Sequence, residues 1–446
     1  MTRALVSVRA CDRPMCAVNL KKVDEIEISP VTRPLDARVV LPGSKSITNR
    51  AMVLAALAQG RSVLESVLLS DDTRYMSEAL RVLGFTVEID EPARRITVSG
   101  RGGTIPAQGG DIFVGGAGTV MRFLVAMVTL GDGRFRVDGN QRMRQRPIGP
   151  QLDAMQRLGA SVYSERDNHC PPVIVDASRA RFEGGETSVD ARASSQFVSA
   201  MLMPAPIWKA GLKLKVIGDT ARPFIDMTLR LMEAWGAKST VEDDMIVVPG
   251  GQWYRAQRFV VEPDASSASY FAAAAAIIGG TVRIEGLTSS SVQGDLGFLG
   301  VLQQMGARVV WHPDHVEVAG TGNLTGVDVA MNSMPDMVAT LAAIAPFASS
   351  PTTIRNVAFI RHHESDRIRA LATELRRLGA TVVENDDGLE IAPSTMHPAA
   401  VETYDDHRIA MSFAVTGLKL AGVKIKQPGC VAKTFPDFFD RLAALA

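Results

Sequence analysis

The chain has 446 residues, more than a single hydrophobic core usually organises, so we expect two domains. Its hydrophobic fraction of 46% and charged fraction of 22% are ordinary for a soluble globular protein. The formal net charge is zero, with 48 basic and 48 acidic residues, which excludes a protein whose overall field attracts nucleic acid or an anionic membrane. Any site for an anion must therefore come from local clusters of cations.

The cysteines are few, and they are Cys11, Cys16, Cys170 and Cys430. Their spacing fits neither a disulfide framework nor a zinc or Cys-x-x-Cys redox site, so we expect a reducing, cytoplasmic compartment. The apolar runs are too short for a membrane-spanning helix, and the first 24 residues lack the apolar core of a signal peptide. We expect residues 1–24 to form a loose N-terminal extension.

The segment Leu41-Pro-Gly-Ser-Lys-Ser-Ile-Thr-Asn-Arg50 joins a strand-like run to a helical run that we expect to end at Gly60. Free backbone N–H groups at a helix start favour anions. Lys45 lies at this start, and Ser46 and Arg50 are four residues apart, so they share one helix face. The spacing is not that of a P-loop. A capped helix with solvated cations and an anion-binding site are equally compatible with this segment.

A pattern of the type Leu-x-x-Leu-Gly, followed by a β-rich run, recurs at intervals of 70 to 77 residues. Each copy predicts a helix that ends at a glycine cap and turns into a strand. The glycines of the five copies are Gly84, Gly159, Gly236, Gly306 and Gly379. So long a period indicates small α/β lobes with several strands and two helices. A last helix near residues 438–446 would complete six lobes, three in each domain.

Clusters of polar groups lie at further helix starts in the first half of the chain. The glycine loop of residues 115–119 precedes a helical run, and Arg142, Arg144 and Arg146 occupy alternate positions. Such a concentration of guanidinium groups favours bidentate binding of an anion. The hydroxyl and amide side chains of residues 194–196 open an apolar helix, where they could cap it or hold phosphate and hydroxyl groups.

Acidic and basic residues also meet at helix starts in the second half. Asp336 precedes an apolar run, where it could cap a helix or act as a general base. Glu364 and Arg367 are three residues apart and face the same way. Arg408 and Lys433 lie near two more helix starts. Each of these residues alone is more commonly part of a structural salt bridge.

Taken together, these segments resemble the family of 5-enolpyruvylshikimate-3-phosphate (EPSP) synthases, or 3-phosphoshikimate 1-carboxyvinyltransferases. The matching motifs run in family order from about residue 26 to the C-terminus. They are Leu41-Pro-Gly-Ser-Lys-Ser-Ile-Thr-Asn-Arg50, Gly116-Ala-Gly-Thr119 with Arg122, Arg146-Pro-Ile-Gly149, Ser194-Ser-Gln-Phe197, Asp264-Ala-Ser-Ser-Ala-Ser-Tyr270, Gln293-Gly-Asp295, Glu364-Ser-Asp-Arg367, Asp406-His-Arg408 and Ala432-Lys-Thr-Phe-Pro-Asp437.

The resemblance implies a fold of two similar α/β domains, each made of three βαββαβ repeats around a pseudo-threefold axis, as in an inside-out α/β barrel. Domain I would take residues 25–43 and 263–446, and domain II would take residues 44–262. The active site would lie in the cleft between the two domains.

The resemblance further implies that the enolpyruvyl group of phosphoenolpyruvate is transferred to the 5-hydroxyl of shikimate 3-phosphate, with release of phosphate. The reaction would proceed by addition and elimination through a tetrahedral intermediate, in the shikimate pathway of aromatic amino acid biosynthesis. The family implies no metal, no organic cofactor, no nucleic acid or membrane partner, a cytoplasmic monomer, and glyphosate as an inhibitor. Both substrates are polyanions, which explains why a neutral protein clusters its cations.

The family also implies roles for individual residues. Lys45, Asp336 and Glu364 would be catalytic, with Asp336 as the base at the 5-hydroxyl and Glu364, assisted by Lys45, handling the proton on the methylene carbon. The residues implied for shikimate 3-phosphate are Lys45, Ser46, Arg50, Ser194, Ser195, Gln196, Asp336 and His363. Those implied for phosphoenolpyruvate are Lys45, Gly118, Arg146, Gln196, Arg367, Arg408 and Lys433.

Several positions depart from the commonest family pattern. Gly116 stands where Asn is usual, and Phe123 stands where Pro is common, both on the phosphoenolpyruvate side where glyphosate binds in this family. These two departures predict an altered sensitivity to glyphosate. His363 stands where Lys is common, which predicts that the affinity for shikimate 3-phosphate depends on pH near neutrality. The remaining departures are Ala221, Phe224 and Phe359.

Two other functions remain as alternatives. The sister enolpyruvyl transferase that acts on UDP-N-acetylglucosamine uses a cysteine in its N-terminal domain, whereas this chain has none between Cys16 and Cys170. A non-catalytic phosphate- or RNA-binding protein on a repeated α/β scaffold would need a basic surface and neither Asp336 nor Glu364. The neutral charge and the two carboxylates disfavour that alternative.

Overall fold

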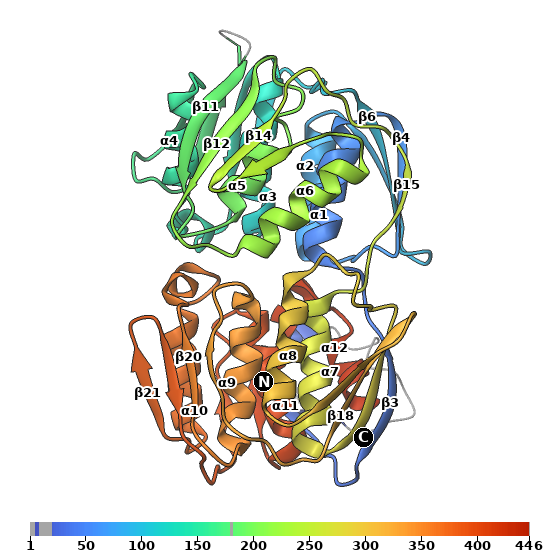
Figure 1. Ribbon diagram of the computed structural model, residues 1–446, viewed down its shortest axis with the longest axis vertical. Coiled ribbons are helices and arrows are strands. Elements are labelled where there is room, and N and C mark those ends of the chain that lie inside the picture. Colours follow the sequence, from blue (N-terminus) through green and yellow to red (C-terminus); the bar gives the residue numbers. More distant parts are fainter. Residues whose placement is uncertain (1–4, 9–19, 179–181, 446) are drawn as a thin grey trace. The chain divides into compact units, whose positions relative to one another are not determined.

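The computed structural model describes residues 5–8, 20–178 and 182–445 (Figure 1). The chain divides into two compact units. We call Gly43–Glu262 the central unit, and we call the segment up to Pro42 together with the segment from Pro263 onward the terminal unit. The chain therefore crosses between the units within one residue of each boundary that we expected from the sequence.

Six four-stranded sheets are present among the described residues, three in each unit. In the central unit the strands of the first sheet, in spatial order, are β15 (Arg258–Val260), β4 (Gln59–Glu65), β6 (Arg95–Arg101) and β5 (Thr86–Asp90). Those of the second sheet are β7 (Gly109–Phe113), β8 (Arg134–Asp138), β10 (Val173–Asp176) and β9 (Val162–Ser164). Those of the third sheet are β11 (Gly184–Asp190), β12 (Gly211–Ile217), β14 (Met245–Val248) and β13 (Thr240–Glu242).

The terminal unit repeats this plan. The strands of its first sheet are β17 (Arg308–Trp311), β18 (His315–Gly320), β16 (Gly280–Glu285) and β3 (Leu35–Val40). Those of its second sheet are β19 (Asp328–Ala330), β20 (Thr352–Arg355), β22 (Gly388–Ile391) and β21 (Val382–Asn385). Those of its third sheet are β1 (Leu5–Val8), β2 (Glu25–Ile28), β24 (Lys424–Lys426) and β23 (Ala400–Val401). Each sheet has a parallel pair that continues into an antiparallel strand, for example β3 with β16 and then β18. This recurrence confirms the six lobes that the glycine spacing predicted. The elements of a repeat follow the order βαβαββ along the chain, however, so the expected order βαββαβ is wrong.

The N-terminal segment differs from the loose extension that we expected. Strand β1 pairs in parallel with β2, with Leu5 opposite Glu25 and Val8 opposite Ile28. Its Leu-Val-Ser-Val sequence is rich in β-branched residues, which suits a strand. Residues 1–4 and 9–19 lie outside the described residues.

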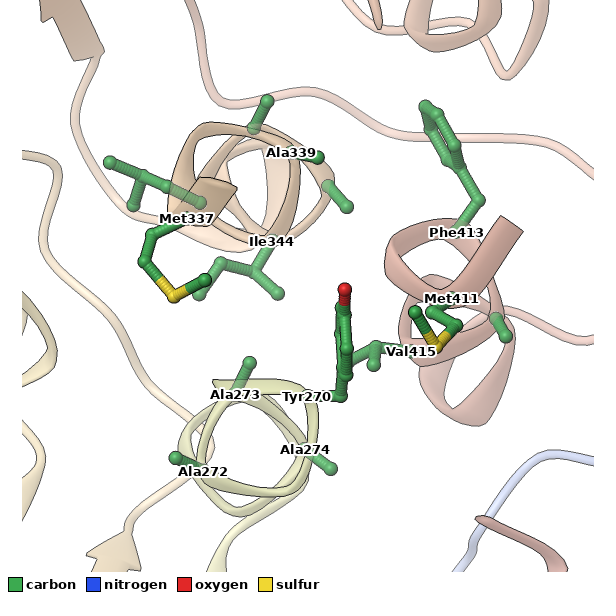
Figure 2. Close-up of a cluster of buried hydrophobic side chains, with 14 of the residues drawn as sticks. Tyr270, Ala272, Ala273, Ala274, Met337, Ala339, Ile344, Met411, Phe413 and Val415 are labelled. Carbon is green, nitrogen blue, oxygen red and sulfur yellow. The ribbon is translucent and has the colours of Figure 1, made fainter. Parts of the chain in front are cut away.

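Each unit is built around three buried inner helices. These are α1 (Lys45–Leu57), α3 (Gly118–Met127) and α5 (Gln196–Leu202) in the central unit, and α7 (Ala265–Ile278), α9 (Val338–Ile344) and α11 (His407–Lys419) in the terminal unit. Nearly all their residues are buried, including polar residues near the helix starts such as Arg50 and Arg408. Figure 2 shows α7, α9 and α11 end-on, with Tyr270, Ile344 and Val415 in the space that they share.

A second helix in each repeat is less deeply buried, and all of these helices except α12 are followed by one of the predicted glycines. These outer helices are α2 (Asp71–Val82), α4 (Gly149–Arg157), α6 (Arg222–Ala234), α8 (Gly297–Gln304), α10 (Arg367–Arg377) and α12 (Phe438–Ala443). The five glycines of the sequence pattern all have φ between 86° and 106°. After each glycine, the next N–H donates to the carbonyl that begins the pattern, as Phe85 does to Leu80 at 2.9 Å. The predicted caps are therefore confirmed as Schellman motifs.

One predicted boundary is wrong. Helix α1 ends at Leu57, whereas we expected it to end at Gly60. Gly60 instead lies in strand β4, opposite Gly100, with φ of 106°. Its conformational freedom serves the start of a strand and not a helix cap.

In the part of the chain that the structure describes, no helix combines the length and apolar character of a membrane span.

Helix α8 offers a matched test of the glycine caps. Replacing Gly306, which has positive φ and ordinary contacts, by Ala should lower the free energy of unfolding by about 1–2 kcal/mol. Replacing Gly300, which lies inside the same helix with open space beside it, should raise that energy by about 0.5–1 kcal/mol. Urea unfolding followed by circular dichroism measures both. Equal effects would contradict the capping role of Gly306.

Candidate functional site

The candidate residues gather at the N-terminal ends of the helices. Lys45, Gly118 and Gln196 are the first residues of α1, α3 and α5, and Arg367 is the first residue of α10. The free N–H groups of a first turn and the positive end of the helix dipole both favour anions at such positions. Three helix starts of the central unit and one of the terminal unit thus carry candidate residues at positions that favour anions.

Lys45 lies beside a carboxylate at the start of α1. The side chain of Ser44 caps this helix by accepting a hydrogen bond from the N–H of Ile47 at 3.5 Å. Lys45 is 13% exposed, and its Nζ lies 3.6 Å from Oδ2 of Asp72, which is almost completely buried. The helix is thus capped, and Lys45 is also oriented at its start. The segment can therefore be both a capped helix and an anion-binding site.

Arg50 is a buried cation that is held by neutral groups. Its Nε donates to Thr228 Oγ1 at 2.7 Å, and its Nη2 donates to Ser199 Oγ at 3.1 Å and to the carbonyl of Phe224 at 3.2 Å. The guanidinium lies 5.1 Å from the centre of the Phe123 ring. Burial lowers the pKa of Arg50 to about 9, so it remains charged at neutral pH. No carboxylate among the described residues pairs with it.

Gly118 lies against two guanidinium groups. A Cβ here would be 2.6 Å from Nη1 of Arg122 and 2.7 Å from Nη1 of Arg146. Both arginines are buried. Arg122 donates through Nη1 to Gln196 Oε1 at 3.3 Å and through Nη2 to the carbonyl of Pro147 at 3.0 Å. The structure thus brings Gly118, Arg146 and Gln196 together around Arg122.

Ser194 and Ser195 lie just before α5 and have different surroundings. Ser194 Oγ accepts a hydrogen bond from the N–H of Gln196 at 3.2 Å. Ser195 is buried, and its side chain makes no capping bond to the helix. The capping interpretation therefore applies to Ser194.

We call these residues, with those around Arg50 and Arg122, the basic cluster of the central unit: Lys45, Ser46, Arg50, Gly118, Arg122, Arg146, Ser194, Ser195 and Gln196.

The terminal unit gathers three carboxylates and three cations, which we call the arginine–carboxylate cluster: Asp336, Glu364, Arg367, Asp406, Arg408 and Lys433. Asp336 belongs to the short 3-10 helix η6 (Pro335–Met337) before α9. Glu364 follows the 3-10 helix η8 (Ala358–His362), and Lys433 ends η9 (Pro428–Lys433). The cluster is balanced in formal charge.

Arg367 is the centre of this cluster and is 2% exposed. Its Nη1 donates to Asp336 Oδ1, its Nη2 to Glu364 Oε2 and its Nε to Asp406 Oδ2, each at 2.9 Å. Burial acts to lower the pKa of Arg367, but the three carboxylates outweigh it and raise the pKa above its ordinary value. Arg367 is therefore permanently charged and held on three sides.

Asp336 and Glu364 each bridge two cations. The second oxygen of Asp336 accepts from Arg408 Nη2 at 2.9 Å, and the second oxygen of Glu364 accepts from Lys433 Nζ at 2.9 Å. Their side chains are 24% and 14% exposed. Both carboxylates are therefore accessible and lie between cations that an external anion could bind.

Asp406 and Tyr270 are supporting residues to which sequence reasoning gave no role. Asp406 is fully buried, caps α11 through the N–H of Arg408 at 2.9 Å and accepts from Ser365 Oγ at 2.9 Å. Tyr270 accepts from Arg408 Nη1 at 3.0 Å, and burial raises the pKa of its hydroxyl. Both lie in motifs quoted above. The position of Asp406 just before a helix was the one feature of the sequence that could have predicted its capping role.

His363 contacts the same arginine. Its Nδ1 lies 3.2 Å from Arg367 Nη1, and its ring packs edge-on against Phe359 with centroids 5.8 Å apart. A guanidinium can only donate, so Nδ1 accepts and the ring proton lies on Nε2. The unit thus brings together Asp336, His363, Glu364, Arg367, Arg408 and Lys433, all of which the sequence singled out.

Comparisons with known proteins identify the family to which this chain is similar. A family model described as EPSP synthase (3-phosphoshikimate 1-carboxyvinyltransferase) matches residues 31–442. A protein named 3-phosphoshikimate 1-carboxyvinyltransferase from Nostoc punctiforme is 49% identical over 421 residues, 94% of this chain and 98% of the relative. One of the same name from Yersinia pseudotuberculosis is 45% identical over 430 residues, 95% and 99% of the two chains.

Among solved structures, EPSP synthase from Acinetobacter baumannii is similar to this chain with a TM-score of 0.79 and 25% sequence identity. The similarity covers 95% of this chain and 98% of that one.

Proposed function

This chain belongs to the EPSP synthase family, and we infer that it is a transferase, a 3-phosphoshikimate 1-carboxyvinyltransferase. It transfers the enolpyruvyl group of phosphoenolpyruvate to the 5-hydroxyl of shikimate 3-phosphate and releases phosphate, within the shikimate pathway to aromatic amino acids. Beyond the family, the observation that supports this function best is that Asp336 and Glu364, two accessible carboxylates, lie between three cations.

We propose that phosphoenolpyruvate binds to Arg367, Arg408 and Lys433. Its carboxylate and phosphate groups would replace Asp336 and Glu364 as partners of these cations. Charge-assisted, bidentate contacts make guanidinium groups well suited to both anions. Asp406, which is fully buried, would keep Arg367 in place during the exchange. The two accessible carboxylates would then be available for proton transfer.

The basic cluster of the central unit would supply the remaining contacts. We propose that Ser46, Arg50, Ser194, Ser195 and Gln196 hold shikimate 3-phosphate, because Arg50 is a buried charge without a carboxylate partner among the described residues. Gly118 and Arg146 would contact phosphoenolpyruvate, with Lys45 between the substrates. To these residues we add Arg122, because its guanidinium lies against Gly118 and Gln196. Residues of both units would thus contribute to the same reaction.

The proposed chemistry needs two proton transfers. In the addition step the 5-hydroxyl oxygen bonds to C2 of phosphoenolpyruvate, Asp336 accepts the hydroxyl proton, and Glu364, assisted by Lys45, delivers a proton to C3. In the elimination step Glu364 takes a proton back from C3, and the bond from C2 to the phosphate oxygen breaks as phosphate leaves with the electron pair. The new C2=C3 double bond gives the enol ether product. Exclusion of water on closure would strengthen each charge contact.

Three further properties are proposals that follow from the family. The protein would be a monomer, which sedimentation would test, and it would be cytoplasmic, which microscopy of the tagged chain would test. Its response to glyphosate would be altered by Gly116 and Phe123, since Phe123 packs on the guanidinium of Arg50. An inhibition constant equal to that of a typical sensitive enzyme would contradict the last proposal.

The function is tested by release of phosphate from phosphoenolpyruvate. Release by the wild type should depend on shikimate 3-phosphate, and Asp336→Ala should lower kcat about 10²–10⁴-fold because it removes the general base. Glu183→Ala is the control, because it removes an exposed ion pair with Lys209. Absence of shikimate 3-phosphate-dependent release in the wild type would overturn the assigned function, and full activity in Asp336→Ala would overturn the role of that residue.

Gly118→Ala should act on substrate binding and not on stability. The new Cβ would displace the flexible ends of Arg122 and Arg146, which lie within 2.7 Å of it. Loss of one charge-assisted hydrogen bond, worth about 1.5–3 kcal/mol, should raise KM for phosphoenolpyruvate about tenfold or more. The control is Gly300→Ala, which has open space. An unchanged KM in Gly118→Ala would remove these arginines from the site.

His363 should make the affinity for shikimate 3-phosphate depend on pH. Protonation of His363 must first break the hydrogen bond that Nδ1 accepts from Arg367, and the resulting imidazolium would attract phosphate. Deprotonation removes that attraction, so Kd should increase between pH 6 and pH 8 relative to His363→Lys. The lysine variant corrects for titration of the phosphate itself. Calorimetric titration at each pH measures Kd. Parallel pH profiles for the two proteins would contradict the prediction.

A further inference from the structure

Two histidines and a glutamate converge on the hairpin between β17 and β18, separate from both clusters described above. One ligand atom from each of His312, His315 and Glu317 can be chosen so that all three lie within 4.8 Å of one another. We propose that these residues form a binding site for a divalent transition metal, with Zn²⁺ as the best match. The site would be independent of the transfer reaction.

The hairpin geometry explains why the three side chains share one face. The N–H of His312 donates to the carbonyl of His315 at 2.9 Å, which closes a four-residue turn and places the two histidines at opposing strand ends. Their rings are stacked, with centroids 4.3 Å apart and an interplanar angle of 10°. Glu317 is two residues beyond His315 on β18, so it points to the same side, while Val316 and Val318 are buried on the other side.

The backbone and a neighbouring carboxylate hold one of these histidines in place. Asp314 Oδ1 lies 2.7 Å from His315 Nδ1, and the carbonyl of Asp314 accepts from the N–H of Gly286 at 2.7 Å. A carboxylate can only accept here, so Nδ1 carries the proton and Nε2 keeps its lone pair. A carboxylate behind a histidine is the usual way in which proteins orient that ring toward a metal. His315 is therefore prepared to be a ligand through Nε2.

The donor set decides which metal fits. Two imidazole nitrogens and one carboxylate oxygen suit Zn²⁺, whereas Ca²⁺ and Mg²⁺ prefer oxygen ligands alone. Three protein ligands would leave one position of a tetrahedral ion for water. The ligands are partly buried, with His315 21% and Glu317 17% exposed, so an ion can reach them from solvent.

Two arginines compete for the same carboxylate. Glu317 accepts from Arg283 Nε and from Arg308 Nη2, each at 3.3 Å. Both arginine side chains are more than half exposed, and exposed ion pairs of this length are weak. A metal could therefore share or take over Glu317. The competition also predicts that Arg308→Gln binds the metal more tightly than the wild type does.

The test is a titration of the metal-free full chain with Zn²⁺, followed by calorimetry. We expect saturable binding of one ion, which is lost in the double variant His312→Ala/His315→Ala and kept in His397→Ala, a control at an exposed histidine of the same unit. Asp314→Asn should weaken binding about tenfold, because it removes the carboxylate behind His315. Bound Co²⁺ should give visible absorption bands in the wild type and in His397→Ala, but not in the double variant.

Folding of the variants is checked separately, by their thermal transition without metal. Zn²⁺ should raise the transition temperature of the wild type and leave that of the double variant unchanged, because an ion that binds only the folded state stabilises it. The proposal is overturned if the wild type shows no saturable binding. It is equally overturned if a double variant with an unchanged metal-free transition still binds one ion.

Discussion

The neutralisation of one buried guanidinium, that of Arg367, governs the site in the terminal unit. Removing such a group from water costs several kcal/mol, and the cost is met here by three carboxylates at 2.9 Å. The three are not equivalent, because Asp406 is fully buried whereas Asp336 and Glu364 are partly exposed. One carboxylate therefore serves the fold, and the other two are those that we propose exchange their cations for a substrate.

The repeat supplies these charges through the starts of the helices. Each βαβαββ repeat contributes one inner helix whose first turn is positive, and adding a buried arginine there is unfavourable unless an anion is nearby. The two units meet this constraint differently. The terminal unit balances its cations with internal carboxylates, whereas Arg50 in the central unit has only neutral partners among the described residues. The proposed binding of polyanionic substrates fits this division, because the substrates would complete one cluster and displace the internal anions of the other.

Features that depend on a single residue and its neighbours could be predicted from the sequence. The five glycine caps were found because positive φ at a helix end is a local requirement that glycine meets best. The same rule failed at Gly60, where positive φ serves a strand. The pairing of Arg367 with Asp406, 39 residues away, and of Arg408 with Asp336, 72 residues away, has no local signal. These two pairings could be expected only from the family. The same holds for Asp336, which bridges two arginines and does not cap a helix.

The central claim is that both clusters bind one pair of substrates, and the most direct measurement is a crystal structure of Asp336→Ala with shikimate 3-phosphate and phosphoenolpyruvate. The account predicts that the anionic groups of phosphoenolpyruvate contact Arg367, Arg408 and Lys433 of the terminal unit together with Arg146 of the central unit. Shikimate 3-phosphate should contact Arg50. A complex in which phosphoenolpyruvate touches residues of one unit alone, or in which Arg367 keeps Glu364 and Asp406 as partners and makes no contact with phosphoenolpyruvate, would contradict the account.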